Sequence, residues 1–160
     1  MNAPVTDQST WMRRCIDIAA ESAASGGGPF GALIVRDGVL IAGGSNAVTL
    51  HNDPTAHAEI QAIRSACKAL DDYRLAGCDL YASTEPCPMC LAAAYWARLD
   101  RVYYAATRFD AAEAGFDDSR IYDELGRAED ARTVPFVRIM GPEGQAPFAV
   151  WKNNANKRHY

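Results

Sequence analysis

The chain has 160 residues, of which 49% are hydrophobic and 22% are charged, and its formal net charge is −4. This length suits one domain with a sizeable core, and the acidic balance argues against a large nucleic-acid footprint, which needs clustered Lys and Arg. No run approaches eighteen apolar residues, so we expect no membrane span, and the first residues lack the pattern of a signal peptide. Five cysteines, an odd number, favour a reducing cytoplasm over a disulfide framework.

Helical periodicity opens the chain and a hairpin follows it. Apolar residues recur at helical spacing over residues 9–24, and the glycine-rich run at residues 26–29 ends that helix. Two apolar stretches rich in β-branched residues come next, at residues 30–35 and 39–42. The Asp37-Gly38 turn between them predicts an antiparallel hairpin.

Two helices and two strands are predicted in the middle of the chain. An apolar-periodic run at residues 56–70 follows a capping sequence, so we expect a helix that starts near Thr55. A strand at residues 78–82, a helix at about 88–98 and a strand at 101–105 come after it. Strand, helix and strand at this spacing predict a parallel crossover.

The last third of the chain predicts one more strand and one more helix. Residues 136–140 have the composition of a fifth strand, and a helix is expected over about residues 146–157. The elements together predict an α/β fold, in which a mixed five-stranded sheet lies between helices in three layers. Neither repeats nor a linker interrupt residues 1–160, so we expect a single domain.

Two short motifs carry the chemistry. They are Pro54-Thr55-Ala56-His57-Ala58-Glu59 and Glu85-Pro86-Cys87-Pro88-Met89-Cys90. His57, Cys87 and Cys90 offer one nitrogen and two thiolates to zinc, and three protein ligands leave a fourth position for water. Zinc lowers the pKa of that water to near neutrality, and Glu59 is close enough to move its protons. This His-x-Glu…Pro-Cys-x-x-Cys arrangement is the signature of zinc deaminases that act on nucleobases.

Two other interpretations of the Cys-x-x-Cys pair are a structural zinc site and a thioredoxin-like redox pair. A structural site needs a fourth ligand at matching spacing. The remaining histidines and cysteines form no second pair of that kind: His51, His159, Cys15, Cys67 and Cys78. We therefore favour a catalytic zinc, one per subunit, over a non-catalytic zinc module.

The chain resembles the cytidine deaminase-like superfamily of zinc deaminases over essentially its whole length, and within it the enzymes that deaminate guanine. Besides the two metal motifs, the resemblance is carried by Gly28-Pro29-Phe30-Gly31-Ala32, Asn52-Asp53, Tyr95-Trp96-Ala97-Arg98 and Asp110-Ala111-Ala112-Glu113-Ala114-Gly115-Phe116-Asp117-Asp118. It implies a three-layer α/β/α fold and the zinc-dependent hydrolysis of guanine to xanthine and ammonia. It does not distinguish a role in purine catabolism from one in purine salvage.

The resemblance also assigns roles to single residues. Phe30 lies near the base, Asn46 donates to the purine ring, and the backbone of Ala58 is a further donor. Trp96 borders the active site. Asp118 meets the exocyclic amine and assists proton transfer. By spacing alone, Asn46 is more often a turn residue, and Asp118 more often a loop residue or helix cap.

Through the C-terminal residues, the resemblance also implies a homodimer. In the resembled enzymes, the segment corresponding to about residues 142–160 crosses to the neighbouring subunit, where its terminal residue, here Tyr160, closes the active site. The runner-up activities are guanosine deamination, deamination of another nucleobase and, less expected, tRNA adenosine deamination. A tRNA enzyme should carry a basic face for phosphates, and this chain is acidic. A small purine, without nucleic acid or membrane, is the expected partner.

Overall fold

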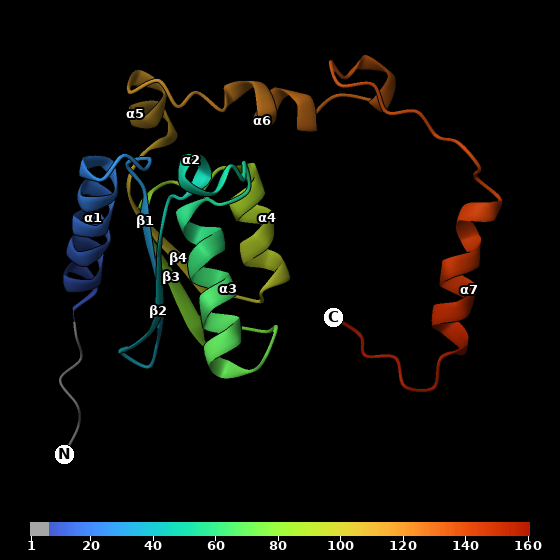
Figure 1. Ribbon diagram of the computed structural model, residues 1–160, viewed down its shortest axis with the longest axis horizontal. Coiled ribbons are helices and arrows are strands. Elements are labelled where there is room, and N and C mark those ends of the chain that lie inside the picture. Colours follow the sequence, from blue (N-terminus) through green and yellow to red (C-terminus); the bar gives the residue numbers. More distant parts are fainter. Residues whose placement is uncertain (1–6) are drawn as a thin grey trace. The chain divides into compact units, whose positions relative to one another are not determined.

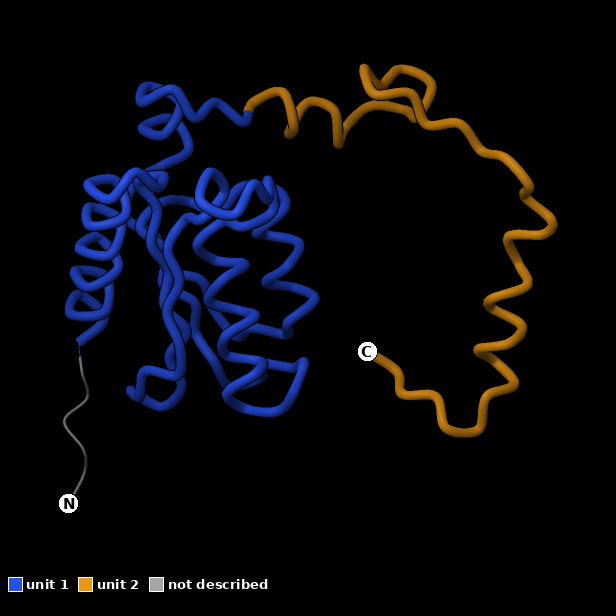
Figure 2. Tube along the Cα trace, viewed as in Figure 1, with its two compact units in different colours: residues 1–118 blue, residues 119–160 orange. Residues whose placement is uncertain are grey.

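A four-stranded sheet forms the centre of the computed structural model, which describes residues 7–160 (Figure 1). Contacts divide the chain into two compact units, residues 1–118 and 119–160, which Figure 2 shows in blue and orange. The sheet belongs to the first unit. Its strands lie in the order β2-β1-β3-β4 and are β1 (Gly31–Arg36), β2 (Val39–Ser45), β3 (Cys78–Thr84) and β4 (Arg101–Ala106).

The pairing of the strands confirms the hairpin and the parallel crossover. β1 pairs antiparallel with both β2 and β3, while β3 pairs in parallel with β4, with Thr84 opposite Ala106 at one end of the ladder. The helix α4 (Pro88–Trp96) connects β3 with β4. Two neighbouring parallel strands need a connection that crosses over a face of the sheet. α4 is this connection, and it lies against one face of the sheet.

Helices cover both faces of the sheet, which confirms the three-layer α/β/α fold. α1 (Gln8–Ala24) lies on one face, and α3 (Ala58–Leu70) and α4 lie on the other (Figure 1). Alternate residues of β1 serve the two sides, as the two-residue period of a strand requires. Ile34 packs in the cluster under α3, whereas Leu33 and Val35 pack with Cys15 of α1.

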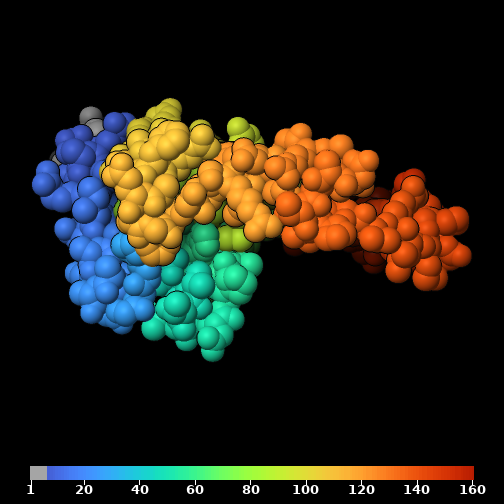
Figure 3. Space-filling view, turned by 90° about the horizontal axis from the view of Figure 1, so that it is seen from above, coloured from blue at the N-terminus to red at the C-terminus, as the bar shows by residue number. Residues whose placement is uncertain are grey.

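Shorter helices complete the two units. α2 (Val48–His51) and α5 (Arg108–Glu113) belong to the first unit, and Figure 3 looks onto the end of this unit at which α5 lies, in gold. The second unit contains α6 (Ser119–Leu125), two 3-10 turns at Glu129–Ala131 and Glu143–Gln145, and α7 (Ala146–Asn153). No helix within residues 7–160 is long and apolar enough to cross a membrane.

The predicted fifth strand is wrong. Residues 136–140 form no strand in the described part of the second unit, and Val137 and Ile139 are each 77% exposed. An apolar composition with β-branched residues favours an extended backbone, but a strand also needs a neighbour to accept its hydrogen bonds. The sheet is therefore four-stranded and mixed rather than five-stranded.

The helix predicted from Thr55 begins three residues later, at Ala58. The backbone N–H and the hydroxyl of Thr55 both donate to Oδ1 of Asp53, at 2.8 and 2.7 Å. This local turn keeps residues 53–55 outside the helix, because an Asp side chain competes for the N–H groups of nearby residues. His57 is therefore the N-cap of α3. The last predicted helix likewise ends earlier, at Asn153 instead of about residue 157.

Candidate active site

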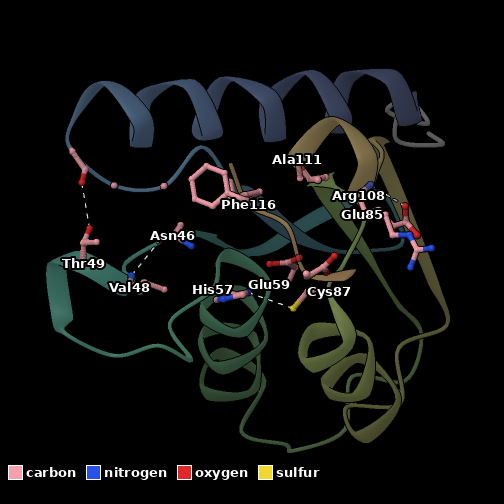
Figure 4. Close-up of a pocket in the computed structure, with 16 residues that line it drawn as sticks. Asn46, Val48, Thr49, His57, Glu59, Glu85, Cys87, Arg108, Ala111 and Phe116 are labelled. Carbon is pink, nitrogen blue, oxygen red and sulfur yellow. Dashed lines mark hydrogen bonds between the residues drawn. The ribbon is translucent and has the colours of Figure 1, made fainter. Parts of the chain in front are cut away.

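Three side chains converge where α3 and α4 begin. His57 is the N-cap of α3, Cys87 is the N-cap of α4, and Cys90 lies buried one turn further along α4. Nδ1 of His57 lies 3.5 Å from Sγ of Cys87 (Figure 4). The same nitrogen lies 3.6 Å from Sγ of Cys90. The two motifs, thirty residues apart in the sequence, thus meet in one cluster of potential metal ligands.

The spacing of this cluster fits zinc. Donor atoms about 2.1 Å (nitrogen) and 2.3 Å (sulfur) from a tetrahedral zinc ion are separated by about 3.6 Å from each other. The two nitrogen–sulfur distances have nearly this value, and all three donor atoms lie within 4.8 Å of one another. The donor set and its geometry therefore suit a zinc ion with three protein ligands.

The electrostatics of the cluster favour a bound cation. Hydrogen bonds from Cys90 and His57 lower the pKa of the Cys87 thiol to about 4, against desolvation by burial. The Cys87 thiolate and burial in turn raise the pKa of Cys90. The hydrogen bond to Cys87 also raises the pKa of His57. The two sulfurs thus share one proton, whose place a metal cation takes when both bind as thiolates.

Glu59 lies buried beside the metal ligands. It occupies the first turn of α3 and is only 7% exposed. Burial raises its pKa, and the negative charge of Cys87 raises it further, while the charge of His57 opposes the shift. A raised pKa brings a carboxyl group closer to the range in which it can both take up and give back a proton. Glu59 therefore has the properties of a general acid–base group next to a metal site.

A cavity of about 360 Å³ opens beside the cluster. Of the residues predicted for the site, Phe30, Asn46, His57, Glu59, Cys87 and Asp118 line it. Burial and the nearby Cys87 raise the pKa of Asp118, whereas Arg108 lowers it. The cavity thus contains a second carboxyl group besides Glu59, on the segment that follows α5.

Asn46 has the orientation expected of a donor. It is 7% exposed, and its Oδ1 accepts a hydrogen bond of 3.3 Å from the N–H of Val48 (Figure 4). The approach of Gly28 is so close that a Cβ there would meet the Asn46 side chain at 2.9 Å. Because the backbone of Val48 engages the oxygen, the side-chain nitrogen is the donor that Asn46 can offer to a ligand.

Besides Cys90, which is the buried third member of the metal cluster, three predicted residues do not line this cavity. Ala58 is fully buried in α3, and Trp96, on α4, is 63% exposed. Tyr160 is the last residue of the second unit and is 74% exposed. Their proposed roles therefore stay predictions.

The structure adds residues that sequence reasoning missed. Phe116 lines the cavity and packs edge-to-face on Phe30, with ring centroids 5.0 Å apart and an interplanar angle of 87°. Glu85, Arg108 and Ala111 line it as well. Phe116 and Ala111 belong to the segment that carries the family resemblance, which was the available signal. Arg108 shows no pattern in the sequence, because only the fold brings it to the cavity.

Comparison with known proteins agrees with this geometry. Residues 5–106 match the family described as the cytidine and deoxycytidylate deaminase zinc-binding region. The chain therefore belongs to this family of zinc-binding deaminases, and its fold and metal cluster are those of the family.

The relatives that resemble the chain over nearly its full length are named for a single activity within the family. The chain is 54% identical over 155 residues to guanine deaminase of Bacillus subtilis (strain 168), covering 96% of this chain and 99% of the relative. The X-ray structure of guanine deaminase from Bacillus subtilis superposes with a TM-score of 0.95 over 97% of this chain and 99% of that one, at 54% identity. A tRNA-specific adenosine deaminase of Agrobacterium fabrum is also 54% identical, but only over 78 residues, 49% of this chain and 51% of the relative.

Replacing one ligand should weaken zinc binding selectively. We expect Cys87→Ser to lower zinc affinity by more than the roughly 10- to 100-fold that loss of an outer hydrogen-bond partner costs a metal site. Cys67→Ser is the matched control, because Cys67 is a half-buried cysteine of α3 outside the cluster. Zinc retained against a competing chelator measures both. Equal retention by the two variants would contradict the assignment of Cys87 as a ligand.

Proposed function

We propose that the chain catalyses the hydrolytic deamination of guanine, which converts guanine and water into xanthine and ammonia. The observation that carries this proposal is that Glu59 and Asp118 line one cavity together with His57 and Cys87 of the metal cluster. The full-length similarity to a protein named guanine deaminase supports the choice of guanine. Relatives named tRNA adenosine deaminases match a smaller part of the chain.

The metal cluster and Glu59 have different roles in the proposed reaction. Zinc held by His57, Cys87 and Cys90 would supply a water molecule activated for attack on the carbon that bears the amine. Glu59 takes a proton from the attacking water at its carboxylate and passes it to the ring nitrogen. It then takes the second proton of that water from the hydroxyl bound at the attacked carbon and delivers it to the amine, which leaves as ammonia as the carbonyl forms. Because Glu59 is buried and its pKa is raised, it can hold the proton between these steps.

The other cavity residues fit the outline of guanine. The edge of guanine that carries the amine presents N–H donors side by side, and the carboxylate of Asp118 can accept from them. Adenine presents an acceptor at the corresponding ring nitrogen, which a carboxylate would repel. We propose that Asn46 donates to the ring and that Phe30 packs against the base. Ala58 as a backbone donor and Trp96 at the border complete the proposed site.

Offering five substrates in parallel tests this assignment. We expect the purified zinc-loaded protein to release ammonia from guanine, with xanthine as the product, and not from adenine, cytosine or cytidine, because Asp118 requires donors on the bound edge. Guanosine is the fifth substrate. Release from guanosine alone would agree with the proposed mechanism but would show that the substrate is a nucleoside. Release from adenine at the rate of guanine would contradict the role of Asp118.

We further propose that the protein is a cytoplasmic homodimer in which residues 1–160 build one deaminase domain with an exchanged tail. Residues of about 142–160 would cross to the neighbouring subunit, and Tyr160 would close the active site there. The apolar side chains of α7 support this proposal, because Phe148 and Val150 are 60% and 72% exposed. Exposed apolar side chains gathered on one helix are typical of a surface that another chain covers.

Mixing two impaired variants tests the exchange. Deletion of Tyr160 should weaken guanine turnover without changing zinc content, and Glu59→Gln should abolish turnover. Co-refolded together, the two chains form mixed dimers, in which an intact Glu59 and an intact Tyr160 meet only if the tail crosses between subunits. We therefore expect activity to recover in the mixture. Failure to recover, with mixed dimers verified by mass, would contradict the exchange.

A further inference from the structure

Glu85 lies at the point where the sheet passes into the metal-binding loop. It follows directly after β3, precedes Pro86 and Cys87, and has a half-buried side chain that lines the cavity. It is not one of the three clustered metal ligands. Any element that contacts the side chain of Glu85 is therefore connected with the loop that carries the metal ligands.

The backbone of Glu85 bonds to the last residue of β4, and its side chain bonds to the first residue of α5. The N–H of Glu85 donates to the carbonyl oxygen of Ala106 at 2.8 Å, which prolongs the pairing of β3 with β4 by one residue. The backbone N–H of Arg108 donates to Oε2 of Glu85 at 3.0 Å (Figure 4). The second bond connects a side chain of the metal-binding motif with the first residue of α5.

The cap of α5 does not provide this bond. In its capping box, Thr107 Oγ1 accepts from the N–H of Asp110, and the Asp110 carboxylate accepts from the N–H of Thr107. The first N–H groups of a helix have no partner within the helix, and Arg108 is the first residue of α5. Glu85 supplies the missing acceptor from another element and so fixes where α5 begins.

A short stretch separates this point from the substrate-facing residues. Ala111 is one turn along α5, and the chain then turns at Gly115, whose φ is +94°, before it reaches Phe116 and Asp118. Ala111, Phe116 and Asp118 all line the cavity. A displaced start of α5 would move this wall of the cavity relative to the metal cluster.

We propose that Glu85 is a positioning residue: the bond from the N–H of Arg108 to its carboxylate fixes α5, and thereby Phe116 and Asp118, against the metal-binding loop. The inference rests on the proposed function, in which Asp118 accepts from the guanine amine. Glu85 acts here through a hydrogen-bond acceptor. Its negative charge and its titration have no part in this role.

Two substitutions of Glu85 separate the acceptor from the charge. Glu85→Ala removes both, whereas Glu85→Gln keeps a carbonyl oxygen that can accept from Arg108 and removes the charge. We expect Glu85→Ala to lower kcat/KM for guanine roughly 10- to 100-fold, since a small misplacement of a positioned group has effects of this size. Glu85→Gln should retain most of the wild-type activity, and all three proteins should bind zinc equally.

Two substitutions of Arg108 test the donor without changing the metal-binding motif. Arg108→Ala removes the side chain and keeps the N–H, whereas Arg108→Pro removes both. Proline is favoured at the first position of a helix, and the extended backbone of Thr107, with ψ 166°, tolerates a following proline. We expect the kcat/KM of Arg108→Pro to be lower than that of Arg108→Ala. The factor between them should be about the same as the factor between Glu85→Ala and the wild type.

Hydrogen exchange provides a readout that needs no substrate. Amides of residues 108–118 should exchange faster in Glu85→Ala than in the wild type and at the wild-type rate in Glu85→Gln, while α3 is unchanged. Equal exchange in all three proteins would overturn the inference, as would equal loss of activity in Glu85→Gln and Glu85→Ala. An inactive wild type would contradict the proposed function alone, because exchange would still decide the role of Glu85. If Glu85→Ala lost zinc, the comparison of Arg108→Pro with Arg108→Ala would decide the role of Glu85.

Discussion

The site depends on the meeting of two helix starts at one point. His57 and Cys87 are the residues that cap α3 and α4, so each side chain leaves the chain just before a helix begins. The unpaired N–H groups at a helix start carry partial positive charge, which stabilises thiolates. Cys90, one turn into α4, returns to the same place because residues three apart share a helix face. A metal cluster of this kind needs no long loops.

The sheet sets how closely these helices approach. α3 packs so tightly on β2 that a Cβ at Gly44 would lie 2.4 Å from the carbonyl oxygen of Ala58 and 2.6 Å from the N–H of Ala62. Backbone atoms cannot withdraw as a flexible side chain can, so only glycine fits. The start of α3, with His57 and Glu59, is thereby held at a defined distance from the strand that leads to Asn46. The metal side of the cavity and the side lined by Asn46 are built on the same close contact.

Local signals predicted most of the first unit. The hairpin followed from Asp37-Gly38, and the ligands followed from the His57-x-Glu59 motif and the Cys87-x-x-Cys90 motif, because each of these patterns lies within a few residues of the sequence. The fifth strand failed because the apolar composition of residues 136–140 cannot show whether a paired neighbour exists. The start of α3 failed because Asp53 binds Thr55 locally and delays the helix. Glu85 was missed since its partner, Arg108, is distant in the sequence.

The central claim is that Glu59 moves protons beside a zinc ion and does not serve the fold. Measuring zinc content and guanine turnover on the same sample of Glu59→Gln tests it most directly, with Glu21→Gln, an exposed glutamate of α1, as the control. We expect Glu59→Gln to bind one zinc per chain and to have an unchanged melting temperature. Turnover should fall at least roughly 100-fold, the lower range of general acid–base catalysis. Turnover near that of the control, with zinc bound, would contradict it.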